Sequence, residues 1–138
     1  SRLVKKVREE KGFAYYIGTS IENMKHADLL IGAVGTKAEQ EEEVISLIKS
    51  VYSDLQKNGI TEKELEDAKG FLTGSFALNL DKNEKLASYL VMMQQEGLGI
   101  DYLNKRNGYI NAVTLNEVNQ VAKELINPVL LVFVSAGQ

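Results

Sequence analysis

The chain has 138 residues, of which 44% are hydrophobic and 25% are charged, and its formal net charge is −3. This length and composition suit one globular domain with its own core, and the lack of cysteine excludes disulfides, thiol nucleophiles and Cys-based zinc sites. The scattered basic residues argue against nucleic acid as a partner. No apolar run approaches the roughly 20 residues of a membrane span. We therefore expect a soluble protein, with cytoplasm, periplasm and organellar matrix all open as its location.

The N-terminal residues predict a short helix followed by a hairpin. The letters S-R-L-V-K-K-V-R are typical of the end of a helix that is already under way at Ser1, and Gly12 marks the turn after it. Residues 13–21 and 28–36 are rich in aromatic and β-branched side chains, which predicts two strands joined by a polar turn. Because Tyr15 and Tyr16 are neighbours on the first strand, we expect them to point to opposite faces.

Helical periodicity follows over most of residues 36–127. Start signals of the form S/T-x-x-E, or a looser form of it, precede the apolar repeats and predict capped helices. These pairs are Thr36 with Glu39, Thr61 with Glu64, Asp81 with Glu84, and Thr114 with Glu117.

The chain ends on a strongly apolar segment after Pro128. Residues 129–135 carry apolar side chains for both faces of a strand, which predicts a central, fully covered strand. The sum is an α+β fold in which helices pack on one face of a mostly antiparallel sheet, with strands near 13–21, 28–36 and 129–135. Residues 1–138 then form a single domain. Three strands make a thin sheet, so we expect missing N-terminal residues or a partner chain to complete it.

Few side chains suggest chemistry. The single histidine, His26, lies in a polar turn and favours a solvated residue, because one imidazole does not make a zinc site. The acidic run 39–43 favours a solvated first helical turn over a cation site. By residue type alone, Arg8 is a surface arginine and Tyr15 a packing tyrosine.

Four segments in this order and spacing resemble the C-terminal domain of the insulinase, pitrilysin and mitochondrial processing peptidase family of zinc metallopeptidases, the inverzincins. They are S-R-L-V-K-K-V-R-E-E-K-G-F-A-Y, G-A-V-G-T, G-I-T-E-K-E-L-E-D-A-K-G-F-L-T-G-S and V-T-L-N-E-V-N-Q-V-A-K-E-L-I-N-P-V-L-L-V-F-V. The resemblance covers essentially the whole chain. It implies a domain that faces a homologous zinc-bearing domain across a clamshell chamber in which peptides are cleaved.

The resemblance also implies where the chemistry resides. Zinc in this family is held by an H-x-x-E-H motif, which this chain lacks, so the chain alone is expected to be inactive and to bind no metal. Zinc would belong to an upstream domain or a partner subunit. The facing domain of the family supplies an arginine and a tyrosine seven residues apart, and Arg8 and Tyr15 match those positions. The resemblance implies that they contact the peptide substrate and stabilise negative charge in the transition state.

Two further expectations follow, and three readings stay open. The resemblance implies that this domain lacks its first strand and part of its first helix, which leaves sheet edges on which a second copy could pair. The leading hypothesis is the zinc-free part of a metalloendopeptidase that acts on peptides or unfolded segments. The alternative is a non-catalytic scaffold or assembly subunit of the same family. A third reading is an unrelated α+β binding domain with a similar architecture.

Overall fold

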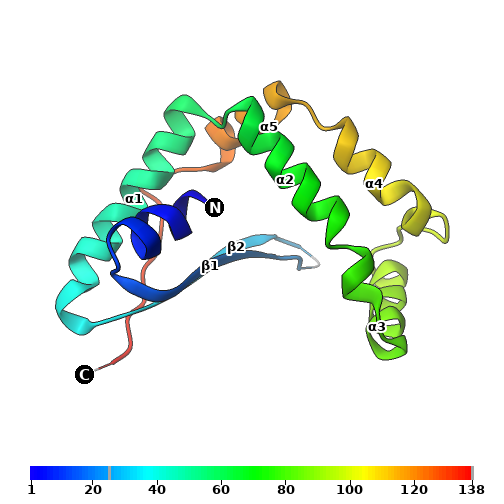
Figure 1. Cartoon of the computed structure of the whole chain (residues 1–138), viewed down its shortest axis with the longest axis horizontal. Coiled ribbons are helices and arrows are strands. Elements are labelled where there is room, and N and C mark those ends of the chain that lie inside the picture. Colours follow the sequence, from blue (N-terminus) through cyan, green and yellow to red (C-terminus); the bar gives the residue numbers. More distant parts are fainter. Residues whose placement is uncertain (25, 138) are drawn as a thin grey trace. The chain divides into compact units, whose positions relative to one another are not determined.

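The computed structural model describes residues 1–24 and 26–137, and it divides into two compact units. Unit 1 comprises residues 1–58 and the C-terminal segment from Ala122, and unit 2 comprises Gly59–Val121. Helices and a two-stranded antiparallel sheet make up the fold, which confirms the α+β class (Figure 1). In chain order the elements are η1 (Val4–Glu10), β1 (Ala14–Glu22), β2 (Leu29–Thr36), η2 (Ala38–Gln40), α1 (Glu41–Asn58), α2 (Glu62–Gly74), η3 (Ala77–Leu80), α3 (Asn83–Gln95), α4 (Tyr102–Ala112) and α5 (Leu115–Leu125).

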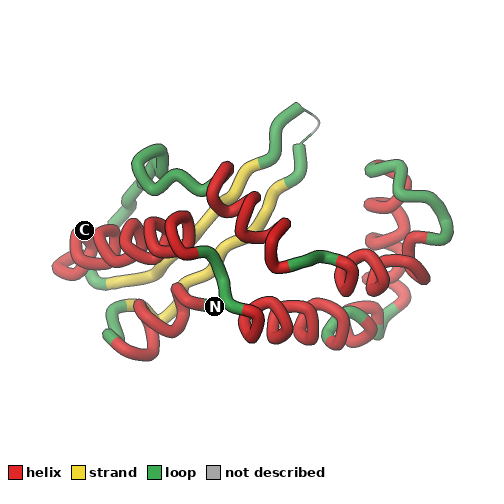
Figure 2. Tube along the Cα trace, turned by 90° about the horizontal axis from the view of Figure 1, so that it is seen from above, coloured by secondary structure: helices red, strands yellow, loops and turns green. Residues whose placement is uncertain are grey.

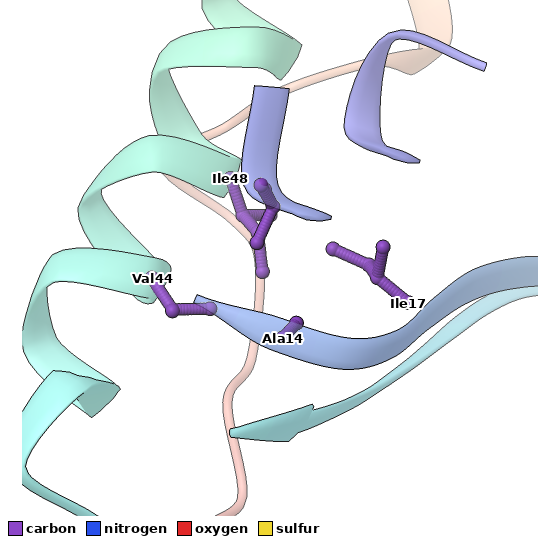
Figure 3. Close-up of a cluster of buried hydrophobic side chains, with 5 residues drawn as sticks. Ala14, Ile17, Val44 and Ile48 are labelled. Carbon is purple, nitrogen blue, oxygen red and sulfur yellow. The ribbon is translucent and has the colours of Figure 1, made fainter. Parts of the chain in front are cut away.

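The core of unit 1 joins the hairpin to two helices. Ala14 and Ile17 of β1 pack against Val44 and Ile48 of α1 (Figure 3), and Val7 of the π-helix η1 completes this buried cluster. Val7 and Val44 are 0% and 1% exposed. Since Val7, Val44 and Ile48 belong to one buried cluster with Ala14 and Ile17, both helices pack on the face of the sheet that carries these two β1 side chains. The expected packing of helices on one face is therefore present in this unit.

The two strands lie side by side (Figure 2), and they pair in an antiparallel ladder with one irregularity. Tyr16 to Glu22 pair regularly with Gly35 to Leu29, but Ala14 pairs with Thr36, so Tyr15 is an extra residue on β1. Such a β-bulge shifts the alternation of side chains by one position. It explains how Ala14 and Ile17, three residues apart, both reach the core.

The predicted third strand, residues 129–135, is wrong. These residues form no strand and pair with neither β1 nor β2. The segment belongs to unit 1, where the Lys49 ammonium of α1 lies 5.3 Å from the centre of the Phe133 ring, while Val132 and Val134 are 89% and 91% exposed. A strand requires neighbouring strands as hydrogen-bond partners. A strand with apolar side chains on both faces also requires other elements packed against each face. High β-propensity supplies neither.

Unit 2 is helical, and its helix starts agree in part with the sequence. Thr61 and Glu64 form a reciprocal capping box at α2. The same exchange opens α5, where the Glu117 carboxylate accepts from the Thr114 hydroxyl at 2.7 Å and from its backbone N–H at 2.8 Å. The loose Asp81 cap is wrong, because Lys82 takes the N-cap position of α3 without a side-chain cap.

The Thr36 cap in unit 1 is also wrong. Instead of capping the helix that follows, its hydroxyl donates a hydrogen bond to the Phe13 carbonyl across the hairpin. Lys37 is the N-cap residue of η2, again without a side-chain bond. A tertiary partner has replaced a local one. Across the described part of the chain, every helix is too short or too polar to cross a bilayer.

Candidate functional site

Each of the two candidate side chains follows directly after a core residue. Arg8 comes after Val7, which is fully buried, and Tyr15 comes after Ala14, which is 6% exposed. Val7 and Ala14 belong to one cluster, so the core fixes the backbone beside both candidates. The side chains themselves are exposed, and Tyr15 retains 70% of its accessible surface. This arrangement combines a rigid backbone with groups that face solvent.

A glycine turn holds the two backbone segments together. Gly12 adopts a φ of 66°, in the left-handed region that favours glycine, and it ends the helix as expected. Its N–H donates to the Arg8 carbonyl at 3.2 Å, and the Phe13 N–H donates to the Val7 carbonyl at 3.0 Å. These two hydrogen bonds, accepted by the carbonyls of Val7 and Arg8, hold the turn between η1 and β1.

The bulge places both tyrosines on the face of the sheet away from the helices. Ile17 points to the core, so its neighbour Tyr16 points away and is 60% exposed. The Tyr15 ring lies against Gly35, which is the strand partner of Tyr16. Partners in a ladder share a face, so Tyr15 lies on the Tyr16 side. The expectation that the two tyrosines point to opposite faces is therefore wrong, because it assumed a regular strand.

The structure brings together the backbones of the two candidates, but it does not link their side chains. Within residues 1–24 and 26–137, neither the Arg8 guanidinium nor the Tyr15 hydroxyl takes part in a hydrogen bond or an ion pair. Both groups carry donors: the guanidinium has five N–H bonds, and the phenol has one O–H. Neither group would have to break a hydrogen bond or an ion pair with another described residue in order to bind a ligand.

The described side chains form no cluster that would hold a zinc ion. Among the described residues, no three histidine, aspartate or glutamate side chains are grouped as metal ligands. His26, the one histidine of the sequence, is exposed in a bend beyond the end of β1. Zinc requires three or four such ligands at about 2 Å.

Sequence reasoning missed three features of this site: the bulge at Tyr15, the shared face of the two tyrosines, and the contact with Gly35. One residue of the sequence, Gly35, could have indicated these features. An isolated glycine inside a strand pattern indicates a bulge or a close approach of another group, and Gly35 is such a residue.

Comparisons with known proteins point in one direction. The family model described as the peptidase M16 inactive domain matches residues 1–72. The chain is 32% identical over 130 residues to a Bacillus subtilis protein named uncharacterized zinc protease YmxG, covering 91% of the chain and 31% of that protein. It is 30% identical over 126 residues to a Helicobacter pylori protein named non-peptidase homolog YmxG, covering 89% of the chain and 28% of that protein.

Solved structures agree with the sequence matches. A crystal structure of a peptidase M16 inactive domain from Pseudomonas fluorescens aligns with a TM-score of 0.78 at 29% identity, covering 93% of the chain and 30% of that structure. A protease structure from Helicobacter pylori aligns with a TM-score of 0.69 at 19% identity, which supports the fold alone. The chain thus spans less than a third of each of these relatives.

Proposed function

Because the chain belongs to the peptidase M16 family, as its inactive domain, we propose that it is the zinc-free part of a zinc metalloendopeptidase and presents Arg8 and Tyr15 to a peptide substrate. The observation that carries this proposal is the pairing of buried anchors with exposed donors at Val7–Arg8 and Ala14–Tyr15. Zinc and the water-activating groups would belong to a homologous domain, on the same polypeptide or a separate subunit. The substrate would be a peptide or an unfolded segment that lies between the two domains.

Arg8 and Tyr15 suit the stabilisation of a carbonyl oxygen that gains negative charge. A guanidinium and a phenol both donate hydrogen bonds, and the guanidinium also carries a positive charge that attracts an oxyanion. Donors held in place before the reaction stabilise the transition state without a reorganisation cost. The core under Val7 and Ala14 supplies that rigidity for the backbone. Loss of one such donor typically lowers the rate by roughly 10²- to 10³-fold.

The test is peptide cleavage by the full-length parent together with its zinc-bearing domain or subunit. Arg8→Ala and Tyr15→Phe are each expected to lower kcat/KM by roughly 10²-fold or more. Lys5→Ala removes another exposed cation from η1, and Tyr109→Phe removes the hydroxyl of a tyrosine that is 58% exposed in α4. Both controls are expected to retain activity. Unchanged kcat/KM in both site variants would remove the assigned role.

A second candidate function is a non-catalytic scaffold subunit of the same family. The name of the Helicobacter pylori relative, non-peptidase homolog YmxG, favours it. Arg8 and Tyr15 would then be surface residues without a substrate. The two functions differ in one readily checked feature, since an active peptidase requires H-x-x-E-H in the full-length gene or in a neighbouring gene. Its absence from both, together with no cleavage by the purified assembly, would favour the scaffold.

A further inference from the structure

Gly35 leaves the space that the Tyr15 ring occupies. A Cβ atom built on Gly35 would lie 3.2 Å from Cδ2 and 3.5 Å from Cε2 of that ring. The first distance is tighter than an ordinary carbon–carbon contact of about 3.5–4.0 Å. Any side chain at this position would therefore press on Tyr15, and a branched one would press harder.

The backbone gives no other reason for a glycine there. Gly35 does not belong to the residues with positive φ, so a side chain at this position would cause no backbone strain. Glycine inside a strand weakens it, because it loses more conformational freedom on folding and offers nothing to pack. Glycine at position 35 therefore lowers the stability of the strand, but it allows the Tyr15 ring to lie against the backbone.

Contacts on both sides of Tyr15 tie β1 to β2. Thr36, next to Gly35, donates its hydroxyl to the Phe13 carbonyl and so ties β2 to the start of the bulge. On the other side, Tyr16 is paired with Gly35 in the ladder. Bulges frequently re-aim a side chain next to an active site. Here the bulge turns Tyr15 to the face away from the helices, and the bare Gly35 backbone lets its ring lie against the sheet.

We propose that Gly35 is a positioning residue for Tyr15, which rests on the substrate-contacting role proposed for Tyr15. Gly35 does not touch the substrate. Its missing side chain sets the place of the phenol, and with it the place of the donated hydrogen bond. A displacement of about 1 Å in such a group is enough to lower a rate by up to roughly 10²-fold.

The proposal predicts opposite effects of Gly35 substitutions on stability and on catalysis. Alanine and valine suit a strand better than glycine does, so Gly35→Ala and Gly35→Val are expected to leave the melting temperature of the full-length protein unchanged or raised. Cleavage is expected to fall slightly in Gly35→Ala and by roughly 10- to 10²-fold in Gly35→Val. The loss should be in kcat rather than KM, since it concerns a bond strengthened in the transition state. A merely structural role of Gly35 predicts lower stability instead.

The hairpin offers two matched controls. A Cβ at Gly32 on the same strand would lie 3.6 Å from its nearest neighbours, an ordinary contact. A Cβ at Gly18 would lie 2.7 Å from the Tyr16 hydroxyl and so would displace the other tyrosine. Gly32→Ala and Gly18→Ala are both expected to retain kcat/KM. A loss in Gly18→Ala with full activity in Gly35→Val would overturn the proposal.

A double-substitution cycle separates this proposal from the role of Tyr15 itself. In the Tyr15→Phe background the phenol is already gone, so adding Gly35→Val is expected to cause little further loss. A Gly35→Val effect that persists undiminished in that background would overturn the positioning role. So would a normal kcat/KM in Gly35→Val alongside a large loss in Tyr15→Phe.

NMR tests the contact between the Tyr15 ring and Gly35 independently of any role of Tyr15 in cleavage. In the full-length protein with labelled glycine, the Gly35 α-protons are expected to carry a ring-current shift that disappears in Tyr15→Leu and persists in Tyr16→Leu. Unshifted Gly35 α-protons in the parent would overturn the positioning of the ring. A shift that behaves as expected, combined with normal cleavage by Tyr15→Phe, would retain the contact and refute only the proposed function.

Discussion

The interactions within unit 1 differ in kind from the interactions within unit 2. The buried apolar side chains of the described residues lie mostly in unit 1, whereas only Leu65 and Met93 belong to unit 2. In unit 2, several side chains form hydrogen bonds with backbone groups that are distant in sequence. Asn119 accepts from the Ile60 N–H at 2.7 Å and donates to the Ile60 carbonyl at 3.3 Å, and the Arg106 guanidinium donates to the Leu72 carbonyl at 3.1 Å.

This difference indicates which part of the protein holds its side chains in the more narrowly defined positions. Close packing allows few alternative arrangements of its members, and the candidate residues Arg8 and Tyr15 stand directly beside packed ones in unit 1. Hydrogen bonds at partly exposed positions contribute less each, because water competes for the same groups. We therefore expect unit 1 to be sensitive to the volume of its side chains and unit 2 to individual polar groups.

The largest effect is expected from the core of unit 1. Ile48→Ala removes three carbon atoms from a side chain that is 8% exposed, and it should lower the free energy of unfolding by about 2–5 kcal/mol. Chemical denaturation measures this loss. Ile31→Ala serves as the control and should cost much less, because this β2 side chain is 45% exposed and its strand partner, Ser20, lies on the Tyr16 face of the sheet. Equal losses in the two variants would contradict a core confined to one face of the hairpin.

An intermediate effect is expected in unit 2 from Asn119→Ala. This change leaves the N–H and the carbonyl of Ile60 without their side-chain partner, which should cost about 1–3 kcal/mol in unfolding free energy. Asn104→Ala is the matched control, because Asn104 is an exposed residue within α4. If denaturation gave the same value for both variants, hydrogen bonding at Ile60 would not be what stabilises this unit.

A smaller effect of opposite sign is expected at Gly70 of α2. A Cβ there would meet nothing within 4 Å, and alanine is the better helix former, so Gly70→Ala should raise the unfolding free energy by up to about 1 kcal/mol. In unit 1 the same change at Gly12, whose φ is 66°, should instead destabilise by about 1 kcal/mol or more. Thermal melts of the two variants are expected to shift in opposite directions, and a common direction would refute this contrast.

The smallest effect concerns pH at the start of α5. Hydrogen bonds from the Thr114 hydroxyl, and then from its backbone N–H, hold the pKa of Glu117 below its ordinary value of 4.5. A carboxyl with a lowered folded-state pKa stabilises the fold above its unfolded pKa, and this contribution is lost as pH falls through the folded pKa. An NMR titration should therefore give a value below 4.5 for Glu117. Thr114→Val should raise it, whereas a value at or above 4.5 in the parent would contradict the cap.

Local signals allowed much of the fold to be predicted. The helix starts at Thr61 and Thr114 depend on partners three residues away, and the turn at Gly12 depends on the conformation of one residue. The same holds for the choice of Arg8 and Tyr15, which came from a family pattern in a contiguous segment. Both side chains are exposed, and their contact with substrate is a proposal.

The sequence by itself determined the capped helix starts at Thr61 and Thr114, the hairpin, and the family to which its residues point. The tertiary structure decided which groups meet. The Thr36 hydroxyl bonds to the Phe13 carbonyl rather than capping a helix, and residues 129–135 have no neighbouring strand. A bulge at Tyr15 brings its ring against Gly35. The physical reason is that helix caps and turns close within a few residues. Strand pairing, register and the face of a side chain instead depend on atoms from distant parts of the chain.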